Sequence, residues 1–139
     1  DMDKVLRMCL VHDLGECFTG DIPSFLKTAA DTEREDTLLE RWVRGLPAPY
    51  CTELTALYGE MDALETQEAR LYKALDKLEA VIQHNEAPIS TWLPREYALN
   101  MTYADENVAF SPYLTALREA VRDETRAKIE AAGGLPPAK

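Results

Sequence analysis

Residues 8–23 read MCLVHDLGECFTGDIP, and they hold the densest group of chemically reactive side chains in the sequence. An apolar run, Met8–Val11, leads directly into the ionisable pair His12 and Asp13. Ionisable groups that follow such a run need partners wherever they become buried, because burial of an uncompensated polar group costs free energy. A divalent metal ion is one such partner: imidazole with carboxylate suits Zn, Mn, Fe, Co or Ni, and carboxylate also suits Mg. The alternative is a hydrogen-bonded pair with a purely structural role.

The residues after this pair indicate which groups would act beside a bound ion. Neighbouring residues on a helix point about 100° apart, so His12 and Asp13 can share one ion only where the helix ends, as Gly15 suggests. Glu16 follows them by four and three residues, which places all three on one side of a continued helical turn. Glu16 is therefore a candidate acid–base residue, or else a solvated residue at a helix end. Asp21, before an Ile-Pro pair, is a second candidate that equally suits a turn.

The rest of the sequence has the periodicity of helices and no convincing strand pattern, so the predicted fold class is all-α. The predicted helices cover residues 4–14, about 31–44, about 50–61, about 66–85 and about 112–132. Apolar residues surround the first helix, and we expect it to be buried on several sides. Thr32 and Glu35 have the capping-box spacing expected at the start of the second helix.

A third candidate metal ligand, Asp76, lies far from the first two in the sequence. Aspartate is unfavourable inside a helix, and Asp76 borders an apolar stripe formed by Leu71, Leu75, Leu78 and Ile82. It could complete the coordination of an ion, or it could be an ordinary surface charge. His84 is eight residues further along, roughly 12 Å on a helix, so we interpret it as a surface histidine that is too distant to share the ion.

Composition and charge exclude several classes of function. The 139 residues suit one domain, which we expect to cover residues 1–134 and to be followed by a flexible tail at 135–139. The net charge of −10 argues against long nucleic acids and anionic membranes as partners. No apolar run is long enough to span a membrane and no secretory signal is visible. With three cysteines and no CxxC pair, a reduced cytoplasmic protein is the simplest interpretation.

The combined pattern resembles the HD-domain superfamily over residues 4–86. The likeness is strongest to the branch that contains the bacterial 5′-deoxynucleotidases and their eukaryotic relatives. That branch has a His-Asp-x-x-Glu motif, then Gly-Asp-Ile/Leu-x-Pro, and later a helix that carries the last metal-binding Asp. The matching positions here are His12, Asp13, Glu16, Gly20, Asp21, Ile22, Pro23, Thr66, Gln67, Glu68, Ala69 and Asp76.

This resemblance implies an HD-domain helical bundle that binds one divalent metal ion and hydrolyses the 5′-phosphate of a small nucleotide. The metal would be Co, Mn, Mg, Zn, Fe or Ni, and its ligands in this chain would be His12, Asp13 and Asp76. Glu16 would act as general acid or base, Asp21 would orient the substrate or the attacking water, and Lys27 would contact the phosphate. Homodimers are common in the branch, so a homodimer is a further expectation.

The sequence departs from the family pattern in one respect. The family has a further histidine ligand well before the His-Asp pair, and no histidine precedes His12 here. We therefore expect the domain to be incomplete at its N-terminal side or its metal site to be degenerate. Two alternatives stay open: a non-catalytic HD-like module that binds a nucleotide or a protein, and a different HD chemistry such as hydrolysis of cyclic nucleotides or nucleoside triphosphates.

Overall fold

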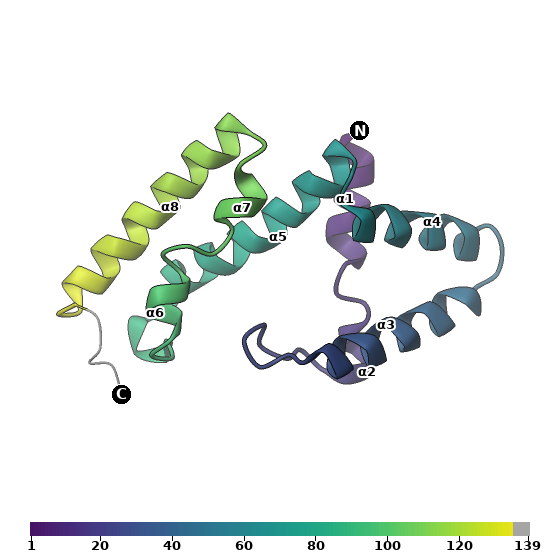
Figure 1. Cartoon of the computed structure of the whole chain (residues 1–139), viewed down its shortest axis with the longest axis horizontal. Helices are drawn as coiled ribbons and strands as arrows, with labels where there is room; N and C mark the ends of the chain where they lie inside the picture. The colour runs from purple at the N-terminus through teal and green to yellow at the C-terminus, as the bar shows by residue number, and fades with distance from the viewer. Residues whose placement is uncertain (135–139) are drawn as a thin grey trace. The chain divides into compact units, whose positions relative to one another are not determined.

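The computed structural model describes residues 1–134, which form helices joined by loops and contain no strand (Figure 1). In chain order the elements are α1 Met2–Val11, α2 Glu16–Thr19, α3 Ala29–Arg44, α4 Tyr50–Ala63, α5 Gln67–Glu86, the 3-10 helix η1 Ile89–Thr91, α6 Glu96–Leu99, α7 Asp105–Val108 and α8 Pro112–Ala131. The predicted all-α fold class is confirmed. Within the described residues, no helix combines the length and the apolar character that a membrane span requires.

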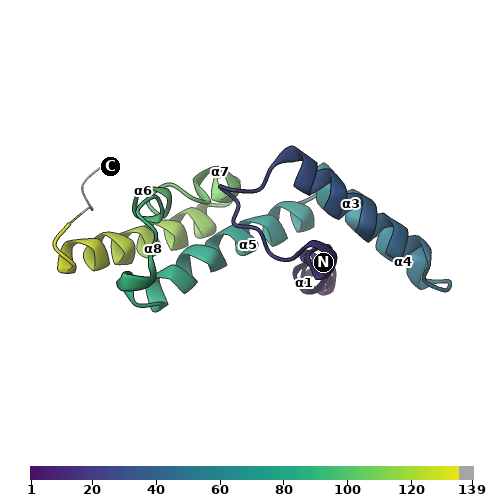
Figure 2. The same ribbon diagram turned by 90° about the horizontal axis from the view of Figure 1, so that it is seen from below.

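The chain divides into two compact units, residues 1–72 and 73–139, and the boundary falls inside α5. In the first unit α3 pairs with α4, and in the second unit α7 pairs with α8 (Figure 2). The single domain expected over residues 1–134 stays a prediction. The flexible tail expected at residues 135–139 lies outside the described residues.

The start of α3 is a capping box, but not the predicted one. Thr28 Oγ1 accepts a hydrogen bond from the Asp31 backbone N–H at 3.3 Å, and Asp31 Oδ2 accepts one from the Thr28 N–H at 2.9 Å. These reciprocal bonds satisfy two N–H groups that lack helical partners at the start of a helix. The predicted box of Thr32 and Glu35 is therefore wrong. Glu35 lies in the second turn of α3, and its side chain makes other contacts.

α1 packs against α4 through one face only. Val5 and Met8 are buried, whereas Leu6 is 56% exposed and Leu10 is 81% exposed. The expectation that this helix is buried on several sides is therefore wrong. Val5 and Met8 are three residues apart and share one side of the helix, while Leu6 and Leu10 are four apart and share another. The second side stays largely open to solvent.

Only part of the apolar stripe predicted on α5 is buried. Leu78 is fully buried as predicted, and Ala74 and Val81 are buried with it. The prediction that His84 is a surface histidine is wrong. Its Nδ1 lies 3.1 Å from Asn100 Oδ1, and its ring centroid lies 5.7 Å from that of Trp92. His84 is therefore a half-buried residue of the second unit.

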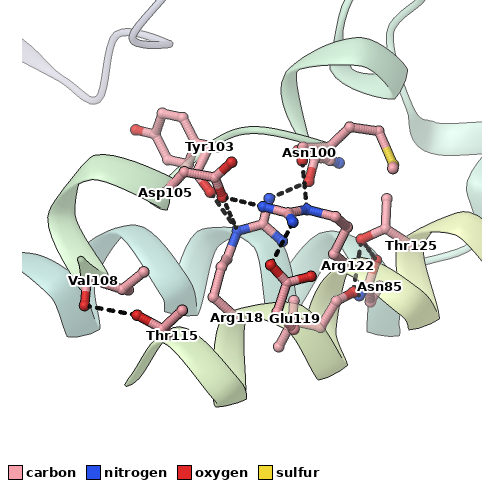
Figure 3. A network of polar contacts seen from close by, with 12 residues as sticks. Asn85, Asn100, Tyr103, Asp105, Val108, Thr115, Arg118, Glu119, Arg122 and Thr125 are labelled. Carbon is pink, nitrogen blue, oxygen red and sulfur yellow. Dashed lines mark hydrogen bonds and ion pairs between the residues drawn. The ribbon is translucent and has the colours of Figure 1, made fainter. Parts of the chain in front are cut away.

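Two arginines of α8 organise the loops of the second unit (Figure 3). Arg118 is fully buried, and it donates hydrogen bonds to the carbonyls of Tyr103 at 2.7 Å and Asn100 at 2.9 Å. Arg118 and Arg122 also pair with the Asp105 carboxylate at 3.0 and 2.6 Å. Because the backbone between α6 and α7 is not regular helix, its carbonyl groups need donors of this kind.

Arg118→Met is expected to destabilise the protein by about 3 kcal/mol, because it removes the donors of a buried, charge-assisted network and leaves carbonyls unpaired. The free energy of unfolding, measured by urea denaturation, checks this. The matched control is Arg126→Met on the same helix, whose ion pair with Asp123 is exposed, and we expect a change within about 0.5 kcal/mol. Equal effects of the two substitutions would contradict the role given to Arg118.

Candidate functional site

The predicted site begins where α1 ends. The last helical residue is Val11, and its carbonyl accepts a hydrogen bond from the Tyr58 hydroxyl of α4 at 2.7 Å. Burial raises the pKa of the Tyr58 hydroxyl to about 12, so this group remains a donor at neutral pH. The next residue, His12, is the C-cap and keeps a helical backbone conformation. The hydrogen bond from Tyr58 therefore ties the end of α1 to α4, and His12 follows directly after this attachment.

His12 is held by both of its ring nitrogens. Nδ1 lies 2.8 Å from the Cys9 carbonyl oxygen, and Nε2 lies 3.1 Å from Asp13 Oδ2. A carbonyl oxygen only accepts, so Nδ1 carries a hydrogen, and a ring without a second proton would present the lone pair of Nε2 to the carboxylate. Two lone pairs at this distance repel each other unless a positive centre lies with them. That centre is a second proton on the ring or a metal ion.

The donor pair fits a divalent metal ion. A neutral imidazole whose Nδ1–H is bound to a carbonyl is the usual form of a metal-binding histidine. Donor atoms 3.1 Å apart that each bind at about 2.1 Å subtend roughly a right angle at the ion, as neighbouring ligands do in an octahedral site. His12 and Asp13 are thus brought together as predicted.

The third predicted ligand belongs to the other unit. Asp76 lies on α5 within residues 73–139, where its Oδ2 pairs with Lys73 at 3.0 Å and with Lys77 at 3.5 Å. Its proposed role as a ligand stays a prediction. Within residues 1–134, no group of three or more His, Cys, Asp or Glu side chains is placed to hold one ion.

Glu16, at the start of α2, is the centre of a group of acidic side chains. Burial raises the pKa of its carboxyl group above the ordinary value, and nearby negative charges raise it further. In decreasing order of effect, these charges belong to Asp13, Asp21 and Glu35. The Lys27 ammonium group acts in the opposite direction. A carboxyl group with a raised pKa is suited to carrying a proton in acid–base chemistry.

Lys27 is held by a residue that sequence reasoning assigned to a different role. Its Nζ lies 2.7 Å from Glu35 Oε2, and the same oxygen accepts a hydrogen bond from Thr19 Oγ1 at 3.3 Å. The Glu35 side chain is only 13% exposed. A signal was present in the sequence: Glu35 is in register with Leu39 and Val43, at four-residue spacing, on the inward side of α3. A carboxylate on such a side indicates a specific partner.

A groove of about 800 Å³ lies between α3 and α4, and the predicted site residues are not among those that line it. Its walls combine apolar side chains with the carboxylates of Glu33, Asp36, Glu40 and Asp62. Burial raises the pKa of Asp36, and the charges of Asp62 and Glu35 raise it further. The volume of the groove does not identify a reaction. The contact between the His12 and Asp13 side chains is the better guide to the chemistry.

Comparisons with known proteins point to one family. The family model described as "HD domain" matches residues 1–118. The proteins named 5′-deoxynucleotidase HDDC2 are similar to the chain: that of Mus musculus is 31% identical over 86 residues, 60% of this chain and 43% of the relative. The Xenopus laevis protein is 34% identical over 83 residues, 58% of this chain and 41% of the relative.

A longer match covers almost the whole chain. The Danio rerio protein of the same name is 30% identical over 134 residues, 95% of this chain and 66% of the relative. In the other relatives the match spans less than half of the relative's length. No solved structure matches the chain. The family model covers far more than half of the sequence, and the matched range includes His12 and Asp13. The chain therefore belongs to the HD-domain family.

Proposed function

We propose that this chain is the metal-binding part of a phosphohydrolase that removes the 5′-phosphate from nucleoside or deoxynucleoside monophosphates. The observation that carries the proposal is the geometry of His12, whose Nδ1 donates to a carbonyl while Nε2 faces the Asp13 carboxylate at 3.1 Å. The names of the relatives support the nucleotide substrate, and a Gly-rich phosphate loop is lacking in the sequence. Phosphate recognition would therefore rely on a metal ion and on charged side chains.

Three residues would hold the ion in this chain: His12 and Asp13, with Asp76 as the third. A divalent ion in such a site supplies Lewis acidity and lowers the pKa of a bound water. His12 keeps its Nδ1–H on the Cys9 carbonyl, which would hold the ring with Nε2 available to the ion. Asp13 would add a negative charge beside the ion. Because Asp13 adjoins His12 in the sequence, both side chains could reach one ion with little movement of the backbone.

The proton transfers would be made by Glu16. Hydrolysis of a phosphomonoester breaks the bond between phosphorus and the 5′-oxygen, adds a water oxygen to phosphorus and leaves a proton on the 5′-oxygen. Glu16 would take a proton from the attacking water and return one to the leaving oxygen, and its raised pKa suits this exchange. Asp21 would orient the water or the substrate. Lys27 would contact a phosphate oxygen as a compact positive charge.

A second candidate is a non-catalytic HD-like module that binds a nucleotide or a protein. One observation favours it: a second proton on the His12 ring would satisfy the 3.1 Å contact between Nε2 and Asp13 Oδ2 without any metal ion. This candidate needs neither a tightly bound ion nor turnover.

Asp13→Ala is expected to weaken the binding of Mn²⁺ at least about tenfold, because even loss of an outer partner of a metal ligand costs that much. Calorimetric titration with Mn²⁺ measures this, and phosphate release from nucleoside 5′-monophosphates should fall with it. The control is Asp123→Ala, since Asp123 is 70% exposed and Asp13 is 61% exposed. The control should leave both measurements unchanged.

The same experiment separates the candidate functions. Turnover of monophosphates that is lost in Asp13→Ala supports the proposal. Turnover confined to cyclic nucleotides or triphosphates would instead assign a different HD chemistry. Nucleotide binding without turnover, equal in wild type and Asp13→Ala, would support the non-catalytic module and exclude the phosphohydrolase.

Glu16→Gln is expected to stabilise the metal-free protein at pH 7. Between the ordinary pKa of 4.5 and the raised pKa of the folded state, the folded protein keeps a proton that the unfolded chain has lost. Wild-type stability therefore falls as pH rises through that window, and Gln has no such loss. The difference in Tm should shrink toward pH 4, with a chelator present throughout.

Glu60→Gln is the control of opposite sign. Hydrogen bonds from Thr66 and Lys4 lower the pKa of Glu60, so its charged form stabilises the folded state above the ordinary pKa and this contribution is lost as pH falls. Glu60→Gln should therefore reduce Tm at pH 7 and have less effect at low pH. A Glu16→Gln protein that is less stable than wild type at pH 7 would contradict the crowding of charge around Glu16.

A further inference from the structure

We propose that Glu35 is a positioning residue that fastens the site turn, residues 12–21, to α3 and holds the Lys27 ammonium group where it can meet a phosphate. The placement of Lys27 for a phosphate rests on the proposed function, whereas the attachment of the site turn to α3 does not. Glu35 stands on α3, while its contacts come from three other places in the sequence. These are Gly15, before α2, Thr19, at the end of α2, and Lys27, in the segment before α3.

The backbone of Gly15 leaves no room for a side chain beside Glu35. A Cβ atom added at Gly15 would lie 2.7 Å from Glu35 Cγ and 3.2 Å from Oε1. Gly15 has a φ of −59° and a ψ of −34°, which any residue adopts, so glycine is not needed here for its backbone conformation. It is needed for close approach. The side chain of Glu35 therefore lies directly on the backbone that leads into Glu16.

The carboxylate of Glu35 completes this attachment. Its Oε2 accepts from Thr19 at 3.3 Å and pairs with Lys27 Nζ at 2.7 Å. Both side chains are half-buried, since Glu35 is 13% exposed and Lys27 is 23% exposed. A half-buried ion pair restricts its members more than a fully exposed pair would. Glu35 thus joins two residues of the site turn, Gly15 and Thr19, and the following Lys27 to one point on α3.

The ion pair with Glu35 fixes the position of the Lys27 ammonium group. The hydrogen bond to Glu35 raises the pKa of Lys27, and the charges of Glu35, Glu16 and Asp36 add to it, so the ammonium group stays charged. An ammonium group has three N–H donors, and the bond to Glu35 uses one of them. A compact charge with further donors is a suitable contact for phosphate oxygens. Loss of Glu35 would leave the charge on a flexible four-carbon chain.

A double-mutant cycle of Gly15→Ala and Glu35→Ala tests the attachment by thermal unfolding. In wild type, Gly15→Ala should lower Tm by a few degrees, because the new Cβ collides with Glu35 Cγ. In the Glu35→Ala protein the collision partner is gone, and Gly15→Ala should raise Tm, as Gly→Ala does at helical backbone angles. An equal shift in both backgrounds would overturn the attachment. The measurement needs neither metal nor nucleotide, so failure of the proposed function would not mimic this result.

Glu35→Gln, which keeps the volume of the side chain, tests the hold on Lys27. NMR titration of the lysine ammonium groups should give a lower pKa for Lys27 in this variant, with partial restoration in Glu35→Asp. Added inorganic phosphate should perturb Lys27 in wild type and require at least about tenfold more phosphate in Glu35→Gln, the loss typical of a positioning partner. The control is Glu33→Gln on the exposed side of α3, which should match wild type. A Lys27 signal that is unaffected by Glu35→Gln would overturn the positioning role.

Discussion

Crowding of negative charge around Glu16 is the constraint on which the first unit depends. Asp13, Asp21 and Glu35 all act on Glu16, and Lys27 is the cation that opposes them. Burial raises the pKa of Glu16 and these charges raise it further, so the fold loses stability when Glu16 ionises. A divalent cation bound among them would relieve the repulsion and stabilise the folded state by mass action. Binding of such an ion would therefore be coupled to the stability of this unit.

The helices around the turn hold it from two sides. Tyr58 of α4 donates to the carbonyl of Val11, and Glu35 of α3 lies against Gly15 and pairs with Lys27. Since α3 and α4 also pack on each other, both attachments belong to one helical hairpin. A change in the packing of that hairpin would therefore move both ends of the site turn. The turn itself has only the four-residue helix α2, too short to be rigid without such support.

The local parts of the site could be predicted from the sequence, and the tertiary parts could not. His12, Asp13 and Glu16 lie within a few residues of the end of α1, so their nearness in the sequence is enough to place them on one turn. The contact of Lys27 with Glu35 depends on which side of α3 faces the turn, and Glu35 had been given to a capping box that Thr28 and Asp31 form instead. The same limit applies to Leu10: periodicity indicates a helix, but not which of its sides finds a neighbour. Asp76 lies beyond the boundary between the units, where no local rule reaches.

A residue that destabilises the fold beside His12 and Asp13 favours a functional over a structural interpretation of this pair. A structural pair needs only the bonds from His12 to Cys9 and Asp13; it gains nothing from an additional carboxylate whose ionisation is disfavoured. Glu16 is such a carboxylate. Destabilising features of this kind gather where a site must bind or react, because stability is given up there for chemistry. Glu16 follows Asp13 by three residues, so this cost falls beside the pair.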